Sequence, residues 1–401
     1  MEGRLVGVGV ALAIVASWAI ASPGSGQEAR GAERSTVWPG ERWETSTPAA
    51  EGIDPAAIDS LIADIEAGGY GLVDHFLLIR HGRVVADRRF EHDYETIAAQ
   101  YDSTNHQYNY DHPQWHPYYR DTELHTLQSV TKSVTSAALG IAIDEGRLAR
   151  VDVPVMPFFA AYEPDTSDPR REAMTLEDLL TMRSGIEWNT SAAYGTGIHS
   201  TDHLEASEEW IRFVLEQPMD TVPGTAYEYN DGASVLIGKV LREATGRRAD
   251  DWAREKLFRP IGIRAFYWKI TPDGEADTEG GLYLSAHDLA RIGYLFLRGG
   301  EWDGRRVVSQ AWVRASTRPL VPDVDPENGR PDPGYGYQWW IPDQEAGEAT
   351  VFAANGYGGQ FLLVAPEYDI VAVFNGWNIH GGAERSSYRA LQERILPATD
   401  R

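Results

Sequence analysis

The chain has 401 residues, a formal net charge of −24 and no cysteine. The absence of cysteine excludes disulfides, thiolate catalysis and thiolate metal sites, and the negative charge disfavours binding to nucleic acids or anionic membrane surfaces. An apolar content of 42% is sufficient for a large core, and the length predicts about two or three structural units.

The first residues are typical of an export signal. A continuous apolar run extends from Leu5 to Ala21, and Ala19-Ile20-Ala21 fits the small-x-small pattern of a cleavage site. We therefore expect a signal peptide over residues 1–21, a disordered linker over 22–37, and a periplasmic or extracellular protein. An uncleaved membrane anchor is the alternative, although the run is at the short limit for a membrane span.

Hydrophobic periodicity predicts the elements that follow. Apolar residues at helical spacing indicate a helix over 55–67, and the apolar runs 76–79 and 84–86 indicate a β-hairpin that turns at His81-Gly82. Further helices are predicted after Ser129 and over 175–180, 204–217, 233–244, 251–257 and 285–298. Strands are then expected over 335–341, 351–354, 361–365 and 370–374, before a closing helix over 385–395.

This order of elements predicts an α+β fold, an α/β sandwich in a single domain over residues 38–397. The simplest assembly pairs the N-terminal hairpin with the C-terminal strands in one antiparallel sheet that helices flank. The mainly helical residues 150–260 would be inserted as a second lobe. A cleft between the two lobes would open at Ser129.

The stretch Ser129-Val130-Thr131-Lys132 is the strongest candidate for a nucleophile and its base. Three residues are just under one helical turn, so the serine and lysine side chains lie on one face of the helix. A serine hydroxyl needs a base within hydrogen-bond reach, and a lysine can serve if its pKa is lowered by burial or by a neighbouring cation. The apolar run after Lys132 predicts a buried helix. A lysine at the first turn of a buried helix is unusual unless it has a specific role. A chance pair on a surface helix is the alternative.

Two later stretches carry possible partners for this serine. Pro223-Gly224 predicts a turn before Tyr227 and Tyr229, and a tyrosine hydroxyl beside a cation can relay a proton. The stretch 355–360, Asn-Gly-Tyr-Gly-Gly-Gln, leads into a strand, and its glycines let a substrate approach backbone N–H groups that can bind an oxyanion. Taken alone, the first stretch also fits a packed tyrosine, and the second fits an ordinary hairpin turn.

Histidines suggest a different class of enzyme, a metal hydrolase. His199 and His203 are four residues apart, but no glutamate follows the first of them as in metalloprotease helices. The segment 101–119 is rich in tyrosine, and we expect a loop packed by aromatic side chains, either structural or forming a wall of the substrate cleft, rather than a metal site. It includes His106, His112 and His116. The sequence thus predicts neither a metal nor a cofactor.

The order of Ser-x-x-Lys, a tyrosine motif and a glycine-rich edge strand resembles the serine β-lactamase and penicillin-binding-protein superfamily. It is most similar to the class C-like branch of esterases, D-amino-acid peptidases and 6-aminohexanoate-dimer hydrolases. The resemblance spans about residues 40–397 and is supported by the stretches 125–133, 174–185, 280–290 and 300–304. It implies a β-lactamase/transpeptidase-like fold and a serine hydrolase that works through an acyl-enzyme.

The resemblance also implies a role for each matching residue. Ser129 would be acylated, Lys132 would be the base that activates it, and Tyr229 would pass the proton to the leaving group. The backbone N–H of Tyr357, between Gly356 and Gly358, would complete an oxyanion hole with the N–H of Ser129. Tyr227 as the relay is the second choice, because no asparagine follows it two residues later.

Two positions depart from the family pattern. Asp231 stands where the family usually has asparagine, so it would either pair with Lys132 and hold it charged or carry a proton itself. Ala354 or Asn355 occupies the place of the usual third-motif lysine or histidine, unless Arg183 or another basic side chain supplies a cation from elsewhere.

The missing cation and the acidic protein together indicate a neutral substrate. We expect a carboxylesterase or amide hydrolase acting on small-molecule esters or amides, with apolar walls from the aromatic segment and from Trp339-Trp340. The alternatives are a β-lactamase or D-amino-acid carboxypeptidase, and a catalytically silent ligand-binding module on the same fold. We expect no nucleic-acid partner and no membrane contact beyond export or an N-terminal anchor.

Overall fold

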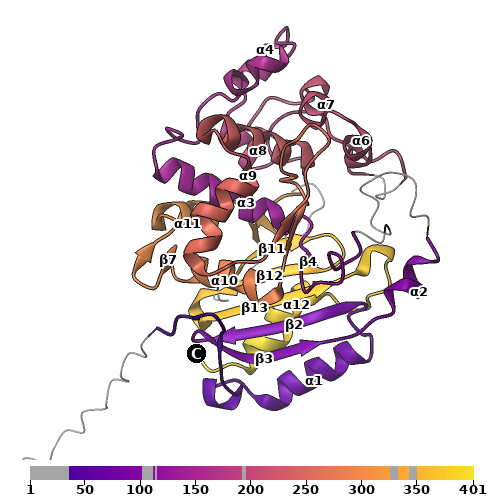
Figure 1. Ribbon diagram of the computed structural model, residues 1–401, viewed down its shortest axis with the longest axis vertical. Coiled ribbons are helices and arrows are strands. Elements are labelled where there is room, and N and C mark those ends of the chain that lie inside the picture. The colour runs from indigo at the N-terminus through magenta and orange to yellow at the C-terminus, as the bar shows by residue number, and fades with distance from the viewer. Residues whose placement is uncertain (1–35, 102–111, 113–114, 192–195, 326–332, 343–349) are drawn as a thin grey trace, which may run out of the picture. The chain divides into compact units, whose positions relative to one another are not determined.

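One sheet joins strands from both ends of the chain (Figure 1). The computed structural model describes residues 36–101, 112, 115–191, 196–325, 333–342 and 350–401, and Val37–Arg401 forms one compact unit. Within this unit, β2 (Val73–Arg80) and β3 (Arg83–Arg89) form the predicted hairpin, and β2 pairs with β13 (Ile370–Gly376). The predicted pairing of the N-terminal hairpin with the C-terminal strands is therefore confirmed.

The main sheet has eight strands among the described residues, in the order β1-β3-β2-β13-β12-β11-β10-β9. Its other members are β1 (Glu44–Thr45), β9 (Gly334–Tyr335), β10 (Trp340–Ile341), β11 (Phe352–Gly356) and β12 (Gln360–Ala365). Only the β1–β3 pair in this sheet is parallel. Two small sheets contain β4 (His125–Thr126), β5 (Tyr267–Trp268) and β6 (Leu282–Leu284), and β7 (Glu301–Trp302) with β8 (Arg305–Arg306).

Both faces of the main sheet are buried. Successive residues of a strand point to opposite faces, so each strand can contribute side chains to two cores. Phe76 and Leu78 of β2 belong to a core shared with α1 (Pro55–Glu66) and α12 (Ser387–Ala390). Leu77 and Ile79 belong to the larger core on the other face, with α3 (Val130–Asp144) and α10 (Ala286–Leu297). The continuous apolar run of this strand is thus explained by helices on both sides.

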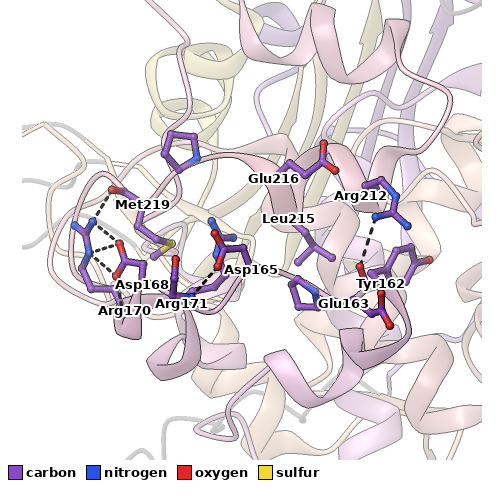
Figure 2. A pocket seen from close by; sticks show the side chains of 13 residues that line it. Tyr162, Glu163, Asp165, Asp168, Arg170, Arg171, Arg212, Leu215, Glu216 and Met219 are labelled. Carbon is purple, nitrogen blue, oxygen red and sulfur yellow. Dashed lines mark hydrogen bonds and ion pairs between the residues drawn. The ribbon is translucent and has the colours of Figure 1, made fainter.

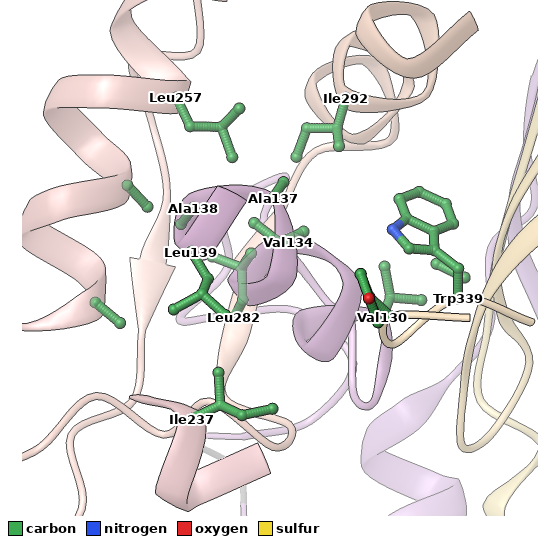
Figure 3. Packing of buried hydrophobic residues seen from close by; sticks show 14 of the residues in the cluster. Val130, Val134, Ala137, Ala138, Leu139, Ile237, Leu257, Leu282, Ile292 and Trp339 are labelled. Carbon is green, nitrogen blue, oxygen red and sulfur yellow. The ribbon is translucent and has the colours of Figure 1, made fainter. Parts of the chain in front are cut away.

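The helix α3 is buried over nearly its whole length, from Val130 to Ala142. Figure 3 shows its apolar side chains between residues of the helical part of the chain and residues near the sheet, including Ile237, Leu257, Ile292 and Trp339. The indole Nε1 of Trp252 donates a 2.9 Å hydrogen bond to the Ala138 carbonyl oxygen. The predicted buried helix is therefore confirmed, and it carries Lys132 into the interior.

Among the described residues between α3 and β5, the regular elements are helices, as predicted. Thr175 and Asp178 cap α5 (Leu176–Leu180) reciprocally, and α8 (Asp231–Thr245) ends at Gly246, whose φ is +72°. The other helices of this part are η2 (Met156–Tyr162), α4 (Pro169–Ala173), α6 (Ser200–Ala206), α7 (Trp210–Glu216), α9 (Ala249–Ala253), η3 (Arg254–Phe258) and η4 (Arg259–Ile261). Elsewhere lie η1 (Ala49–Glu51), α2 (Tyr94–Ala98), α11 (Gln310–Ser316), η6 (Pro366–Tyr368), η7 (Asn378–His380), η8 (Leu391–Ile395) and η9 (Leu396–Ala398).

Two predicted elements are wrong. The helix expected over 204–217 is divided into α6 and α7, because the N–H of Ser207 bonds the Leu204 carbonyl and ends the first helix. The strand expected over 335–341 is the hairpin β9–β10, whose turn contains Gln338 at a φ of +63°. A Cβ on Gly336 would lie 2.0 Å from the Ser316 carbonyl oxygen, so a close backbone approach shapes this turn.

None of the helices in the described part of the chain is long and apolar enough to cross a membrane. The predicted signal peptide and most of the predicted linker lie outside the described residues.

Candidate active site

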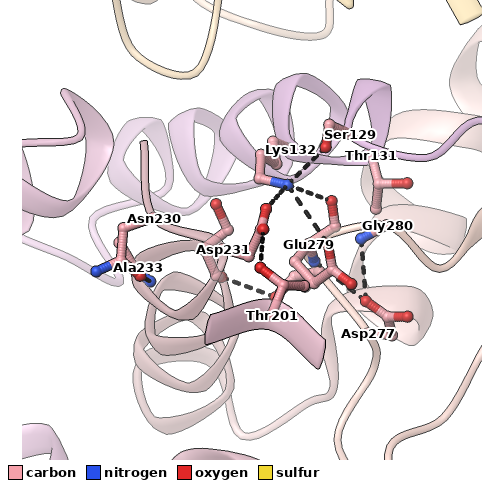
Figure 4. Close-up of polar contacts among 12 residues, drawn as sticks. Ser129, Thr131, Lys132, Thr201, Asn230, Asp231, Ala233, Asp277, Glu279 and Gly280 are labelled. Carbon is pink, nitrogen blue, oxygen red and sulfur yellow. Dashed lines mark hydrogen bonds and ion pairs between the residues drawn. The ribbon is translucent and has the colours of Figure 1, made fainter. Parts of the chain in front are cut away.

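The serine and lysine of the Ser-x-x-Lys stretch meet at the start of α3 (Figure 4). Ser129 is half-buried, Lys132 is 1% exposed, and Lys132 Nζ donates a 2.9 Å hydrogen bond to Ser129 Oγ. Gln128, directly before the serine, has a φ of +48°. A non-glycine residue in this region costs about 1–3 kcal/mol and needs support from its surroundings. The buried Gln128 side chain supplies some of that support through a 3.1 Å hydrogen bond to Thr126 Oγ1.

The Lys132 ammonium has a partner for each of its three protons. Besides Ser129, Nζ contacts Asp231 Oδ1 at 2.7 Å and the Glu279 carbonyl oxygen at 2.6 Å. Burial alone would lower the pKa of Lys132, but the charges around it, foremost that of Asp231, raise this pKa well above its usual value. Of the two roles that the sequence left open for Asp231, the geometry favours the pair that holds Lys132 charged.

Thr201 and Glu279 lie beside the Lys132–Asp231 ion pair. Thr201 Oγ1 of α6 donates a short hydrogen bond to Asp231 Oδ2, and Glu279 Oε2 lies 3.5 Å from Lys132 Nζ. Burial, with the nearby Asp277 and Asp231, raises the pKa of the Glu279 carboxyl well above its usual value. The neutral form of Glu279 is therefore favoured, and the Asp231 carboxylate, at 2.7 Å, is the nearer of the two side chains to Lys132 Nζ.

Of the two candidate tyrosines, Tyr229 is the one beside Lys132. Its ring centroid lies 5.3 Å from Lys132 Nζ, and hydrogen bonding to Ser129 and Lys132 favours its phenolate form. Burial outweighs these effects, so the pKa of Tyr229 is raised and the phenol is neutral at rest. Tyr227 packs against Tyr335 instead, and its buried hydroxyl has no partner among the described residues.

The glycine-rich strand end lies beside the turn that precedes Ser129. A Cβ on Gly356 would meet the Leu127 carbonyl oxygen at 2.3 Å and Gln128 Cβ at 3.2 Å, so only glycine allows this approach. Gly356 ends β11, and Gly358 follows in the turn to β12 with a φ of +82°. Tyr357 between them is 43% exposed, and its hydroxyl donates to the Ile379 carbonyl. The structure thus brings the predicted oxyanion segment next to Ser129.

No lysine or histidine occupies the third-motif position. Ala354 is fully buried and Asn355 is half-buried in β11. The Arg183 guanidinium, which could have replaced the missing cation, bonds Thr181 Oγ1 at 3.0 Å and the Gly224 carbonyl at 3.3 Å. Neither partner belongs to the group around Ser129 and Lys132.

The aromatic side chains that were predicted to form walls of the cleft lie in different surroundings. Trp340 stacks on Tyr229 with ring centroids 5.9 Å apart, whereas Trp339 is fully buried against Phe296 and Phe352. In the described part of the aromatic segment, Tyr119 stacks on Tyr267 at 3.8 Å. His106 lies outside the described residues. Of these side chains, Trp340 is the one in contact with the proposed relay.

Two other features do not belong to this site. A pocket of about 640 Å³ is lined by residues of the helical part, among them Tyr162, Arg171 and Met219, and shares no residue with the Ser129 group (Figure 2). His199 caps α6 by accepting from the Thr201 N–H. Among the residues that the structure describes, neither His199 nor His203 joins a group of three possible metal ligands.

Comparison with known proteins decides the family. The β-lactamase family model matches residues 59–392. The chain belongs to the β-lactamase family. It is therefore a serine hydrolase with an α+β fold, and the resemblance found in the sequence is confirmed.

The curated relatives of this chain include a 6-aminohexanoate-dimer hydrolase and an esterase. The 6-aminohexanoate-dimer hydrolase of Paenarthrobacter ureafaciens is 26% identical over 295 residues, which cover 68% of this chain and 71% of that protein. Esterase EstB of Burkholderia gladioli is 28% identical over 152 residues, covering 36% of this chain and 38% of EstB.

Solved structures share the fold at lower identity. EstCE1, a hydrolase with promiscuous acyltransferase activity, has a TM-score of 0.62 and 16% identity, with 85% of this chain and 97% of that chain covered. A D-stereospecific amidohydrolase from Streptomyces has a TM-score of 0.58 and 18% identity, with 86% of this chain and 100% of that chain covered.

Sequence analysis missed several members of the site. Glu279 directly precedes the Gly280 stretch that supported the resemblance, yet no local pattern links it to Lys132. Thr201 and Gln128 contribute through a hydrogen bond to Asp231 and through backbone strain, respectively. The roles of these residues depend on tertiary contacts. The only sequence signal for them was a position next to a recognised motif.

We predict that Gly356→Ala lowers the hydrolysis of a nitrophenyl ester by about 10²-fold, because a displacement near 1 Å at a reacting centre has that effect. The added Cβ must move β11 away from the Leu127 carbonyl. Steady-state kinetics and far-UV circular dichroism would separate this loss from unfolding. The control is Gly280→Ala, whose Cβ would meet its nearest neighbour, Gln128 Oε1, at an ordinary 3.5 Å. Equal activity of the two variants would contradict the assignment.

Proposed function

We propose that this chain is an exported hydrolase that cleaves neutral esters or amides through an acyl-enzyme on Ser129. The observation that carries the proposal is the 2.9 Å contact of Lys132 Nζ with Ser129 Oγ, with Tyr229 beside both groups. The Gly356 strand end next to Ser129 supports an oxyanion hole made by the N–H groups of Ser129 and Tyr357.

In the mechanism we propose, the Lys132–Tyr229 pair first loses one proton to water, and the base so formed takes the proton of Ser129 Oγ as this oxygen attacks the carbonyl carbon. Lys132 donates to Ser129 at rest, so the serine proton is free to be donated toward the phenol oxygen. Tyr229 then protonates the leaving group as the tetrahedral intermediate collapses. A water molecule, activated by the same pair, hydrolyses the ester bond to Ser129 and restores the enzyme.

The charges near Ser129 support a neutral substrate. The Lys132 ammonium is already neutralised by Asp231, and no lysine or histidine stands at Ala354 or Asn355 to hold a substrate carboxylate. A net charge of −24 further disfavours anions. Trp340, stacked on Tyr229, offers an apolar surface. The names of the relatives, an amide-dimer hydrolase and an esterase, agree with this substrate class.

The proposal is tested first at the nucleophile. A fluorophosphonate probe should label Ser129, as located by peptide mass spectrometry, and Ser129→Ala should abolish both the label and ester hydrolysis. Ser136→Ala is the matched control in the same helix, because the Ser136 hydroxyl is buried and has no partner among the described residues. Retained hydrolysis by Ser129→Ala would overturn the assignment. Ligand binding without turnover or labelling in the wild type would favour the silent module.

We predict that Tyr229→Phe lowers kcat by about 10²–10⁴-fold, the usual contribution of a general acid–base group. Tyr227→Phe is the matched control, since its hydroxyl has no hydrogen-bond partner among the described residues and removing such a buried group leaves the packing intact. Stopped-flow measurement of acylation for both variants would check this. A larger loss for Tyr227→Phe would show that the other tyrosine is the relay.

The charge of Asp231 should set the pH dependence. Asp231 raises the pKa of both Lys132 and Tyr229, so Asp231→Asn should lower both values. The basic form of the pair then appears at lower pH, and the rising limb of the kcat/KM profile should move to lower pH. Asp220→Asn, at an exposed aspartate, is the control. An unchanged limb, or one displaced to higher pH, would exclude this role for Asp231.

Substrate class is decided by kinetics on four compounds. We predict a higher kcat/KM for a short-chain nitrophenyl ester than for a chromogenic cephalosporin, because the cephalosporin carries a carboxylate and neither Ala354 nor Asn355 offers a cation to hold it. An aminohexanoate dimer and a D-amino-acid amide complete the comparison and distinguish amide hydrolysis from esterase activity. A cephalosporin value above that of the ester would make β-lactamase the better assignment.

A further inference from the structure

Three side chains from distant parts of the sequence meet beside the hairpin β2–β3. His75 Nε2 of β2 lies 2.7 Å from Asp87 Oδ1 of β3, and His287 Nε2 of α10 lies 2.8 Å from Asp87 Oδ2. The two imidazole nitrogens and the carboxylate all offer a ligand atom within 4.8 Å of one another. Two imidazoles and one carboxylate are donors that zinc prefers.

The spacing of these atoms suits a bound ion. Zinc binds histidine nitrogen and carboxylate oxygen at about 2.0–2.2 Å, so neighbouring ligand atoms of a tetrahedral site lie about 3.3 Å apart. The distances from the Asp87 carboxylate oxygens to His75 Nε2 and His287 Nε2, 2.7 and 2.8 Å, are shorter than this value. The limit within which all three ligand atoms lie, 4.8 Å, is longer than this value. Small side-chain rotations therefore suffice to place all three around one ion.

Neighbouring residues fix two of the three proposed ligands, and the cluster is open to solvent on one side. The His75 side chain is 7% exposed, and the His287 backbone is fixed by a 3.2 Å hydrogen bond from Trp43 Nε1 to its carbonyl. The side chains of Asp87 and His287 are 41% and 32% exposed, so an ion and its remaining waters can reach them. The site thus combines fixed donors with access from solvent.

The charges around the cluster are compatible with a cation. Arg89 is the nearby positive side chain, and its Nη1 is paired with Glu123 Oε1 at 2.8 Å. Glu123 interacts electrostatically with both His75 and His287 and offers a further carboxylate. The net charge of −24 also raises the local concentration of cations.

We propose that His75, Asp87 and His287 form a binding site for Zn²⁺ or a similar divalent transition metal, distinct from the Ser129 site. Its ligands come from β2, β3 and α10, so the ion ties the sheet to the helix that covers it. Among described residues, β1 pairs with β3 only at Arg83 and Val84. The end of β3 that carries Asp87 therefore has β2 as its paired strand, and the metal holds this end in place.

Metal binding to the full chain tests the proposal. After treatment with a chelator and its removal, calorimetric titration with Zn²⁺ should give one ion per chain, and bound Co²⁺ should give visible absorption bands. Saturating Zn²⁺ should raise the unfolding temperature and slow backbone hydrogen exchange at the end of β3. Activity toward esters is not needed for any of these measurements.

Two variants and one control decide where the metal binds. Asp87→Asn and His287→Gln should each lower Zn²⁺ affinity at least tenfold, since even residues that only support a ligand contribute about 10–100-fold. The double variant His199→Gln/His203→Gln should bind as the wild type does. His287→Gln removes a partly exposed ring, so it remains informative if Asp87→Asn fails to fold.

Three results of the Zn²⁺ titrations would overturn the proposal. They are no Zn²⁺ binding by the wild type, wild-type affinity in His287→Gln, and loss of binding in the control alone. A lower unfolding temperature of the Asp87 variant without any Zn²⁺ binding would show that the three side chains form a hydrogen-bonded cluster only, and this result also overturns the metal site.

Discussion

A buried ammonium group organises the centre of this protein. Lys132 is 1% exposed, and its three protons bridge α3, the start of α8 and the Glu279 carbonyl before β6. Removing one partner of a buried ion pair costs about 3–5 kcal/mol, a large share of the 5–15 kcal/mol that stabilises a typical domain. The contacts that place Ser129 are therefore also contacts that hold the surrounding elements together.

The carboxylate at Asp231 distinguishes this site from the usual family pattern. An asparagine could accept a hydrogen bond from Lys132 without adding charge, whereas Asp231 favours the ammonium form. In the proposed mechanism this arrangement stabilises the resting state and opposes formation of the base. The same charge leaves the ammonium little capacity to attract a substrate anion, so in this proposal proton transfer and substrate choice are linked through one side chain.

The sequence predicted those features that depend on local pattern. The hairpin, the capped helix after Thr175 and the buried helix after Ser129 each have a clear period or cap, and the structure contains all three. The ordered motifs also identified the family, because each motif is weak alone but their order is specific. For this reason the positions of Tyr229 and Gly356 close to Ser129 and the turn before it could be predicted, whereas their roles remain proposals.

The remaining features depend on contacts between distant segments. The break between α6 and α7 and the turn at Gly336 follow from backbone contacts that no periodicity reports. Glu279 reaches Lys132 across 147 positions of sequence, and His75, Asp87 and His287 meet only because α10 packs against β2. Patterns in a single sequence do not report which distant residues come into contact.

The strand order has a consequence for synthesis on the ribosome. The apolar strand β2 is made early, but its neighbour β13 is among the last segments to emerge. Until then one edge of β2 has unpaired N–H and C=O groups, which can pair with another nascent chain. Gly356 also emerges late, so a chain that stops before β11 lacks both the partner of β2 and the segment beside Ser129. Termination before β11 thus leaves a fragment that has an unpaired edge on β2 and lacks the segment beside Ser129.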